Sequence, residues 1–533
     1  MVKKLLLTLL VCGFLWSSAF AGSRHVLRSF PAPGGYSSGL TWDGEALWLA
    51  DWRAQQLVRM DPKSGKVSKT LPSPGFAPEG LAWGAGRLYV SDRASRRVYV
   101  IDPETEIVER SYPTPGHRPR GLGWDGAHLL MADSGTDKIY VLNPEDGTVL
   151  RSFRAPGGES SGLCYDGRHV WVSDRMADAL YRVTMEGMVA TTLPAPGPFA
   201  AGLAWDGKYL WNVDFETDEV YQVDVEHWEA FATADTVQAT IEVVHTIRNE
   251  GPGRLVQGEI ALALPPKTLE NQWLLGPVTY EREPDRIATD RWGQRAALFL
   301  FGELDAGETF TAQYKVPAEV ASLQYYLFPE KVGGLEEIPA EILKTYLADG
   351  SRLMITDPMI QKTAKQIVGD ERNPYWMARK LHEYVVNHIT YKMVGGWDTA
   401  LTVLERGTGS CSESTFLLVA LCRAVGLPAR FEAGSWRRGD TASLDDDNHR
   451  WTEVYLPNYG WVPCDPSTGK GASPAGIAGL FGQIRNHLFV TTHGAGDSEY
   501  LGWNYNSEST YSFKGTCSVF SDRMILWDRF EKE

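Results

Sequence analysis

A repeat of 40 or 41 residues runs through residues 25–225 and leaves few folds open to that part of the chain. Each copy carries a glycine, then leucine, a small residue and an aromatic residue, and an aspartate follows 12 residues after the glycine. Short β-rich runs alternate with turn dipeptides such as Asp43-Gly44 and Asp125-Gly126. This period and pattern predict propeller blades of about four strands each. The marker glycines are Gly39, Gly80, Gly121, Gly162 and Gly202.

The ends of the repeat array indicate how it closes into a ring. Residues 26–30 read Val-Leu-Arg-Ser-Phe, as do residues 149–153 at the end of a complete repeat, and the fifth copy has no clear equivalent after Val223. We therefore expect the N-terminal strand to complete the last blade, because closure removes exposed sheet edges. The array resembles propeller repeats of the NHL and YVTN type, which implies a five-bladed β-propeller over residues 22–228.

The residues that recur in every copy suit a structural role better than a binding role. A blade needs the same turn bonds and packing each time, so the repeated aspartates and tryptophans are interpreted as structural. A protein or glycan ligand on the propeller would instead contact positions that differ between blades.

The first 21 residues have the pattern of a secretory signal peptide. Lys3 and Lys4 precede an apolar stretch, and Ala19-Phe20-Ala21 forms a small-x-small cleavage site. A lipoprotein anchor at Cys12 is the alternative, weakened by Val11 where a small residue is expected. We therefore expect an exported protein, periplasmic or secreted.

Composition narrows the classes of partner. The chain is 43% hydrophobic with a formal net charge of -15, which indicates globular domains and argues against a nucleic-acid partner, because phosphate contacts need a basic surface. Beyond the signal segment no apolar run reaches transmembrane length. The run from Phe416 to Leu427 is better read as a buried helix.

The pattern changes twice after the repeats. Residues 229–335 alternate with period two, as at Val237, Ala239, Ile241 and Val243, and predict a β-sandwich that serves as a spacer. Residues 336–533 begin with helical periodicity, including the helix-start pairs Asp357-Pro358 and Asn373-Pro374, and then return to strands. This last part is predicted to be an α+β domain.

Three short segments of that domain contain the candidate catalytic residues. Cys411 follows Gly-Thr-Gly-Ser and opens an apolar helical run, so it should lie in the first turn, where the helix dipole lowers a thiol pKa. His449 begins a strand-like segment, and Asp465 ends another after the turn at residues 457–460. A hairpin there would bring His449 and Asp465 together, so that a carboxylate orients the imidazole that accepts the thiol proton.

These segments together resemble the transglutaminase-like superfamily. The resemblance rests on Gly-x-Cys heading an apolar helix, Gly-Leu-Pro-Ala-Arg at 426–430, His before Trp-x-Glu-Val-Tyr, and Gly-Trp-x-x-x-Asp-Pro. It implies a papain-like fold with Cys411 as nucleophile, His449 as general base and later acid, and Asp465 as orienting carboxylate. Arg450 departs from the pattern, since a small residue usually separates this His from Trp. Strand alternation should turn the Arg450 side chain away from His449.

Other candidates suit structural roles. Cys164 and Cys422 are read as core, a disulfide between Cys464 and Cys517 stays open, and five cysteines after export leave at least one free thiol. Val386 stands where a zinc motif at His382-Glu383 would need its second histidine, and the run Asp445–Asp447 lacks the glycine and glutamate of a calcium loop. No metal or cofactor is expected.

The sequence thus favours an exported thiol enzyme that acts on amide bonds of peptides or proteins through an acyl-enzyme, by hydrolysis or by transamidation. The backbone N–H of Cys411 would stabilise the oxyanion, and Tyr391 is a weak candidate for the second donor. The alternative is a catalytically silent exported scaffold whose propeller binds a protein or glycan partner.

Overall fold

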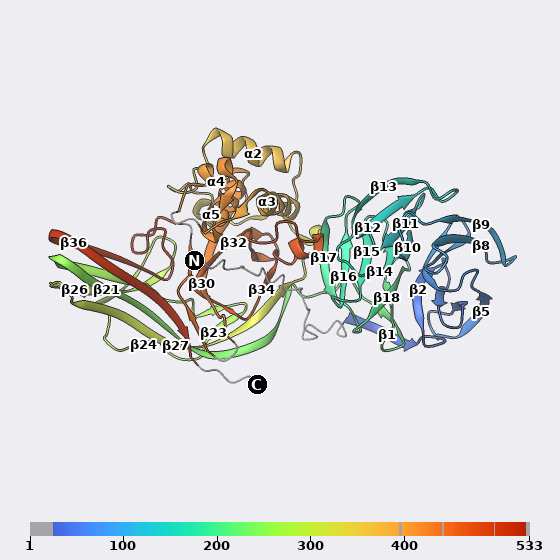
Figure 1. The fold of residues 1–533 in the computed structure, drawn as a ribbon, viewed down its shortest axis with the longest axis horizontal. Helices are drawn as coiled ribbons and strands as arrows, with labels where there is room; N and C mark the ends of the chain where they lie inside the picture. The colour runs from blue at the N-terminus through green and yellow to red at the C-terminus, as the bar shows by residue number, and fades with distance from the viewer. Residues whose placement is uncertain (1–24, 394–396, 440–441, 495, 529–533) are drawn as a thin grey trace, which may run out of the picture. The chain divides into compact units, whose positions relative to one another are not determined.

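The computed structural model describes residues 25–393, 397–439, 442–494 and 496–528, and the chain divides into two compact units (Figure 1). The first unit contains residues 1–228 together with 472–478, and the second contains residues 229–471 and 479–533. The predicted signal peptide, residues 1–21, lies outside the described residues.

The described residues of the first unit form five four-stranded antiparallel sheets of propeller-like repeats. β1 pairs with β20 in the last sheet, so the N-terminal strand completes the fifth copy, as the sequence predicts. The short helix α6 (Pro474–Ala478) also belongs to this unit, where the N–H of Ala475 donates to the Pro156 carbonyl at 3.0 Å. The strands are β1 (Val26–Pro31), β2 (Ser37–Trp42), β3 (Leu47–Asp51), β4 (Gln56–Met60), β5 (Val67–Pro72), β6 (Pro78–Gly84), β7 (Arg87–Asp92), β8 (Arg97–Asp102), β9 (Ile107–Pro113), β10 (Pro119–Trp124), β11 (Leu129–Asp133), β12 (Lys138–Leu142), β13 (Val149–Arg154), β14 (Ser160–Tyr165), β15 (Val170–Asp174), β16 (Ala179–Val183), β17 (Val189–Pro194), β18 (Ala200–Trp205), β19 (Leu210–Asp214) and β20 (Glu219–Val223).

The marker glycines lie where the first strand of one sheet meets the first strand of the next. A Cβ atom at Gly121 would come within 2.6 Å of the Ser161 carbonyl oxygen, and one at Gly202 would come within 2.4 Å of the Leu40 backbone nitrogen. The fifth sheet therefore approaches the first as closely as neighbours in sequence approach each other. The repeated aspartates hold loops: Asp133 accepts hydrogen bonds from the backbone N–H groups of Arg118 and Gly135 at 2.8 and 3.0 Å.

We expect Gly121→Ala to destabilise the first unit by about 1–3 kcal/mol, because backbone atoms of the next sheet cannot yield to the added methyl group. Gly123→Ala is the matched control on the same strand. A Cβ at Gly123 meets its nearest neighbours at an ordinary 3.5 Å, and the equivalent positions in other copies carry side chains, as at Ala82 and Cys164. Hydrogen–deuterium exchange of β10 and β14 measures the effect. Equal protection in the two variants would contradict it.

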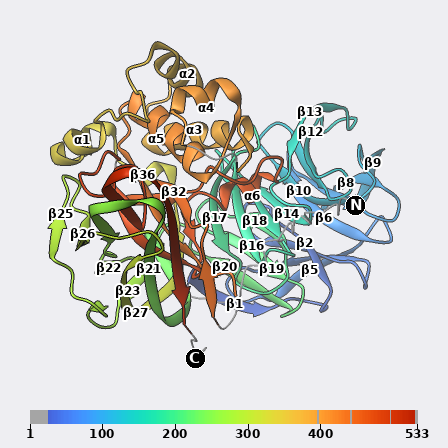
Figure 2. The ribbon, with the colours of Figure 1, turned by 60° about the vertical axis from the view of Figure 1, so that its left-hand side comes forward.

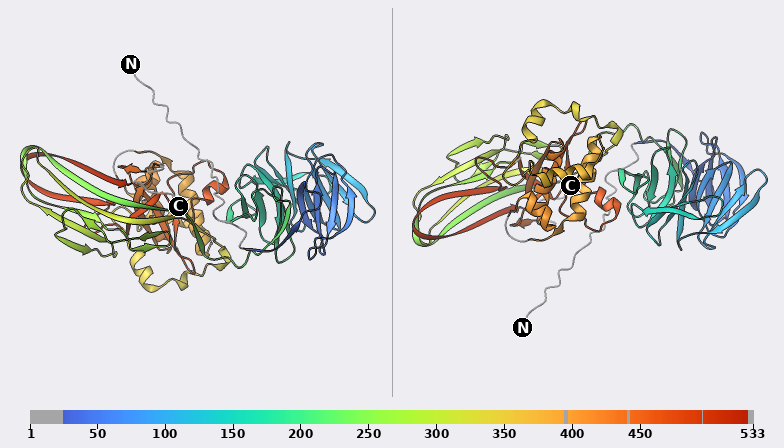
Figure 3. Two further views of the ribbon diagram at one scale, coloured as in Figure 1. Left: turned by 90° about the horizontal axis from the view of Figure 1, so that it is seen from below. Right: turned by 90° about the horizontal axis from the view of Figure 1, so that it is seen from above.

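The second unit is organised around a ten-stranded sheet, whose longest strands run side by side (Figure 3). β21 pairs with β27 along its first half and with β36 over residues 241–262, and β36 comes from the C-terminal end of the chain. Residues 229–335 therefore do not form a separate β-sandwich, because β36 belongs to the same sheet as β21. The last strand returns to cover β21, which would otherwise present unpaired backbone groups along that side. The strands are β21 (Phe231–Ala263), β22 (Thr268–Leu269), β23 (Gln272–Leu274), β24 (Thr279–Tyr280), β25 (Arg286–Thr289), β26 (Arg295–Phe301), β27 (Thr309–Tyr325), β31 (Ser443–Asp445), β34 (Gln483–Ile484) and β36 (Ser507–Trp527).

The remaining elements of the second unit form a helical layer against a small antiparallel sheet of order β33-β32-β30-β35 (Figure 2). Asp357 and Asn373 cap α2 and α3 ahead of a first-turn proline, as the sequence predicts. The elements are α1 (Ala340–Tyr346), α2 (Pro358–Val368), α3 (Pro374–His388), β28 (Thr390–Tyr391), α4 (Ala400–Arg406), β29 (Thr408–Gly409), α5 (Cys411–Ala424), β30 (Ala429–Trp436), β32 (His449–Leu456), β33 (Gly460–Cys464) and β35 (Leu488–Gly494), with 3-10 turns at Pro329–Lys331 and Leu335–Glu337.

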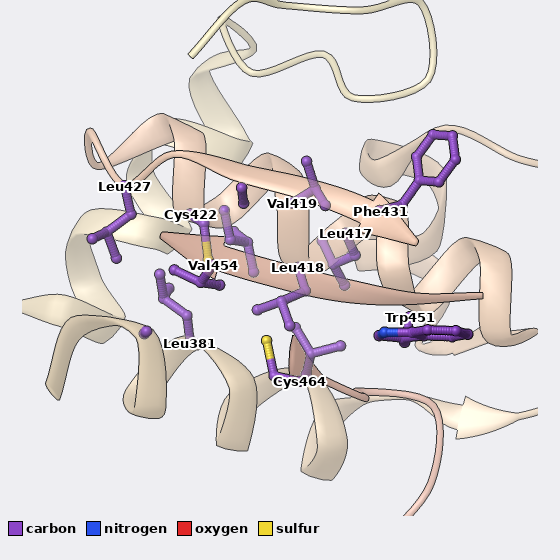
Figure 4. Packing of buried hydrophobic residues seen from close by; sticks show 14 of the residues in the cluster. Leu381, Leu417, Leu418, Val419, Cys422, Leu427, Phe431, Trp451, Val454 and Cys464 are labelled. Carbon is purple, nitrogen blue, oxygen red and sulfur yellow. The ribbon is translucent and has the colours of Figure 1, made fainter. Parts of the chain in front are cut away.

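Helix α5 lies at the centre of this layer and is buried along almost its whole length. Its apolar side chains pack against β30 and β32 in one cluster, which also encloses the sulfur atoms of Cys422 and Cys464 (Figure 4). The five described cysteines are all free thiols, so Cys464 and Cys517 form no disulfide. The core thus holds the start of α5 rigidly beside the start of β32.

Candidate active site

Cys411 is the first residue of α5, and a capping box fixes the turn that presents it. Ser410 is the N-cap: its hydroxyl accepts from the N–H of Glu413 at 3.5 Å, and the Glu413 carboxylate accepts from the N–H of Ser410 at 2.8 Å. Glu413 is fully buried and pairs with Arg406 at 2.8 Å. The sulfur therefore lies at the positive end of a helix whose start is held on both sides.

The hairpin between β32 and β33 brings His449 and Asp465 together, as the sequence predicts. Nε2 of His449 lies 2.8 Å from Oδ2 of Asp465, and Cys411 is hydrogen-bonded to the same imidazole. Since Nε2 faces the carboxylate, Nδ1 is the nitrogen left for the sulfur. The structure thus places the three residues chosen from the sequence in one connected chain.

Two further residues, which lie outside the three sequence segments, orient Asp465. The N–H and the hydroxyl of Ser467 donate to Oδ1 of Asp465 at 2.8 and 2.6 Å. Nε2 of His382, on α3, lies 3.0 Å from the backbone carbonyl of Asp465. Ser467 follows Asp465-Pro466 directly, so an Asx-type turn was the available signal for it.

The electrostatics of the site favour a thiolate beside an imidazolium. Burial raises the pKa of the Cys411 thiol, but the hydrogen bond and charge of His449, with the backbone N–H and charge of Arg450, lower that pKa below its ordinary value overall. Burial lowers the pKa of His449, whereas the charges of Asp465 and Cys411 raise it to about 10. At a pH between the pKa of Cys411 and the pKa of His449, the sulfur is ionised and the imidazole is protonated.

The pKa of Asp465 is also shifted in the direction this arrangement needs. Burial raises the pKa of the carboxyl, but the His449 charge and the hydrogen bonds from His449 and Ser467 lower it overall. Asp465 is therefore a carboxylate at neutral pH.

Aromatic rings fix the position of the imidazole. Trp436 meets His449 edge-on with ring centroids 5.3 Å apart, and Trp451 stacks on it at 5.9 Å. Trp436 lies at the end of β30, and its role could not be recognised from the sequence because that strand is remote from the His449 motif.

A cleft of about 490 Å³ opens on Cys411 and His449. Its walls combine aromatic rings with small hydroxyl side chains, and an ion pair between Arg438 and Asp447 at 3.2 Å lies at its rim. This mixture suits a peptide-like ligand with both apolar and hydrogen-bonding groups. The lining residues are Tyr391, Met393, Trp397, Ser410, Cys411, Ser412, Trp436, Arg438, Asp447, Asn448, His449, Ser467, Thr468 and Tyr505.

The part of the chain that the structure describes contains neither a candidate metal cluster nor a candidate membrane-spanning helix. No group of three or more His, Cys, Asp or Glu residues there could hold a metal ion. No helix within the same residues has both the length and the apolar character that crossing a membrane requires.

A known family model matches the segment that contains this site. Residues 361–466, which include Cys411, His449 and Asp465, match the family model of the transglutaminase-like superfamily. The chain therefore contains a transglutaminase-like domain.

The curated relatives are similar over limited segments. An uncharacterized protein of Haemophilus influenzae is 28% identical over 133 residues, which make up 21% of this chain and 36% of that protein. The uncharacterized protein YebA of Bacillus subtilis is 33% identical over 78 residues, which are 13% of this chain and 10% of YebA. The chain spans about a third or less of the length of these relatives.

Two solved structures show limited similarity to this chain. A putative cysteine protease from Cytophaga hutchinsonii has a TM-score of 0.37 at 14% identity and covers 56% of this chain and 100% of its own. A streptogramin B lyase has a TM-score of 0.26 at 18% identity and covers 38% of this chain and 76% of its own.

Proposed function

We propose that this protein is an exported thiol enzyme that cleaves or exchanges amide bonds of peptides or proteins. Cys411 is the nucleophile, His449 the general base and acid, and Asp465 the orienting carboxylate. The observation that carries the proposal is the hydrogen-bonded chain from Cys411 through His449 to Asp465, at the start of a buried helix and open to a cleft.

The reaction follows from the positions of these groups. The Cys411 thiolate attacks the carbonyl carbon of an amide, and a C–S bond forms while the carbonyl oxygen becomes an oxyanion. His449 gives its proton to the leaving nitrogen, the C–N bond breaks, and an amine departs from a thioester. The neutral imidazole then takes a proton from water, which attacks the thioester and releases a carboxylic acid and the thiol. An amine in place of water gives a new amide, and hydrolysis is the simpler outcome.

The oxyanion needs donors directed at the reacting carbonyl. The backbone N–H of Cys411 supplies one at the helix start. We propose the Tyr391 hydroxyl as the second: Tyr391 lines the cleft, and burial together with the charge of Cys411 raises its pKa to about 12, which keeps the O–H group protonated.

A scaffold function is the second candidate, and the first unit contains an observation in its favour. We propose a five-bladed propeller whose variable positions bind a protein or glycan partner. The residue before the marker glycine is serine in two copies and glutamate, arginine or alanine in the other three. At this position Arg120, only 6% exposed, pairs with Glu79 at 3.1 Å, and it also pairs with Glu159 at 3.5 Å. Tyr36, Trp52, Phe199 and Phe215 form a run of ring contacts on the loops of the first and fifth sheets.

A proteome-wide comparison of amide cleavage and cross-linking decides between the two candidates. Incubation of exported proteins with the wild type should produce new termini or cross-links that Cys411→Ala does not produce. Cys422→Ala is the matched control, since this second thiol of α5 is fully buried and burial raises its pKa. Identical profiles for the wild type and Cys411→Ala would refute the enzyme and favour the scaffold.

A further inference from the structure

Arg450, the residue after His449, is a completely buried cation inside a set of aromatic rings. Its side chain is 0% exposed. The guanidinium carbon lies 4.4 Å from the ring centroid of Tyr505, 4.5 Å from Phe431 and 4.9 Å from Phe416. Trp397 contributes a fourth ring at 5.3 Å.

This guanidinium makes fewer hydrogen bonds than a fully buried arginine side chain ordinarily does. Nη2 donates to the Trp503 carbonyl at 2.5 Å, whereas Nε and Nη1 have no hydrogen-bond partner among the described residues. Among the described residues, no aspartate or glutamate is hydrogen-bonded to the guanidinium. Aromatic faces attract a cation, but a buried charge ordinarily also needs an anion. Burial lowers the pKa of Arg450 to about 10, so the guanidinium is charged at neutral pH.

The candidate nucleophile acts on this cation, since a Cys411 thiolate raises the pKa of Arg450. The backbone N–H of Arg450 donates towards the Cys411 sulfur, and the hydroxyl of Thr415, one turn along α5, donates to the Arg450 carbonyl at 3.3 Å. Trp397 and Tyr505 pack on the guanidinium and also line the cleft beside Cys411. The start of α5 and the start of β32 therefore hold the sulfur and the guanidinium in one desolvated region.

We propose that Arg450 is a positioning residue whose buried charge is the second counter-ion of the Cys411 thiolate, besides His449. The thiolate then lies between two cations, which favours its ionised form before the attack and again when it leaves the thioester. This inference rests on the proposed function, since it takes Cys411 as the nucleophile. It also gives a reason for an arginine at a position where the family pattern has a small residue.

Other titratable groups around the sulfur do not replace this charge. Asp465 pairs with His449 and Glu413 pairs with Arg406. Arg438 pairs with Asp445 and Asp447. The two tyrosines facing Cys411 have raised pKa values and are neutral. The groups are His449 and Arg450 on β32, Asp465 after β33, Glu413 on α5, Tyr391 on β28, and Arg438, Asp447 and Tyr505 on loops.

The pH profile of Cys411 alkylation by iodoacetamide tests the inference, because only the thiolate reacts and its fraction falls tenfold for each pH unit below the thiol pKa. Arg450→Met keeps an apolar, flexible side chain among the rings and removes the charge. Its profile should shift by about one pH unit or more towards alkaline pH, so that the rate at pH 6 falls about tenfold while the rate at high pH is unchanged. Arg450→Lys should restore most of the wild-type profile. A profile of Arg450→Met that coincides with the wild type would overturn the inference.

A second measurement leaves Arg450 intact, in case Arg450→Met does not fold. In His449→Ala, the ratio of the alkylation rates with iodoacetate and with iodoacetamide should exceed the ratio for a free cysteine peptide, because a nearby cation attracts the anionic reagent. A ratio equal to or below that of the peptide would refute the second counter-ion. Labelling that depends on His449 but not on Arg450 rejects this inference alone. Labelling of Cys411 that is indifferent to His449 rejects the proposed function as well.

Discussion

Replacement of His449 by alanine is expected to reduce kcat/KM for amide cleavage by roughly 10⁴-fold. The variant loses the proton acceptor for the thiol and the proton donor for the leaving amine, and it also loses one of the charges that lower the Cys411 pKa. The measurement is kcat/KM on a substrate identified by the proteome-wide comparison, with Cys411→Ala as the zero level.

His487→Ala is the matched control for that experiment. His487 is a second imidazole of the same region: it stacks on Trp436 with ring centroids 4.8 Å apart, and burial lowers its pKa to about 3, so it is neutral. It lies outside the chain from Cys411 to Asp465, and its removal should change kcat/KM by less than about tenfold. Equal losses in the two histidine variants would contradict the role of His449.

The substitution Asp465→Asn should lower kcat/KM by roughly 10²–10⁴-fold without unfolding the domain. The amide retains the size of the carboxylate and can still accept from Ser467, but it removes the negative charge that raises the pKa of His449. The imidazolium would then lose its proton at a lower pH than in the wild type, and the thiolate–imidazolium pair would persist over a narrower pH range. The expected profile of kcat/KM therefore ends at a lower pH on its alkaline side.

Asp447→Asn provides the comparison for Asp465→Asn. Asp447 also lines the cleft, but its carboxylate pairs with Arg438 on the rim, where its side chain is 45% exposed. Loss of an exposed pair of this kind should have a small effect. If Asp447→Asn and Asp465→Asn had the same pH profile and the same activity, Asp465 would not be the group that orients His449.

Local sequence was sufficient to predict the elements whose partners lie nearby in the chain. The 40-residue period predicted the four-stranded sheets, because four of them form within one copy of the repeat and the fifth is completed by the matching N-terminal strand β1. The positions of Cys411, His449 and Asp465 could be predicted as well. A helix start depends on its capping residues, and the hairpin that joins His449 to Asp465 depends on one short turn.

The tertiary structure was needed wherever the partners come from distant segments. Nothing near β21 indicates that β36 will pair with it, since the two strands are separated by the whole helical layer. The enclosure of Arg450 is assembled from Trp397, Phe416, Phe431 and Tyr505, which lie on four different segments. Strand alternation predicts only the side to which Arg450 points. The neighbours of the buried Arg450 charge could be water, a carboxylate or a thiolate. Which of them it contacts depends on the segments that pack against that side of β32.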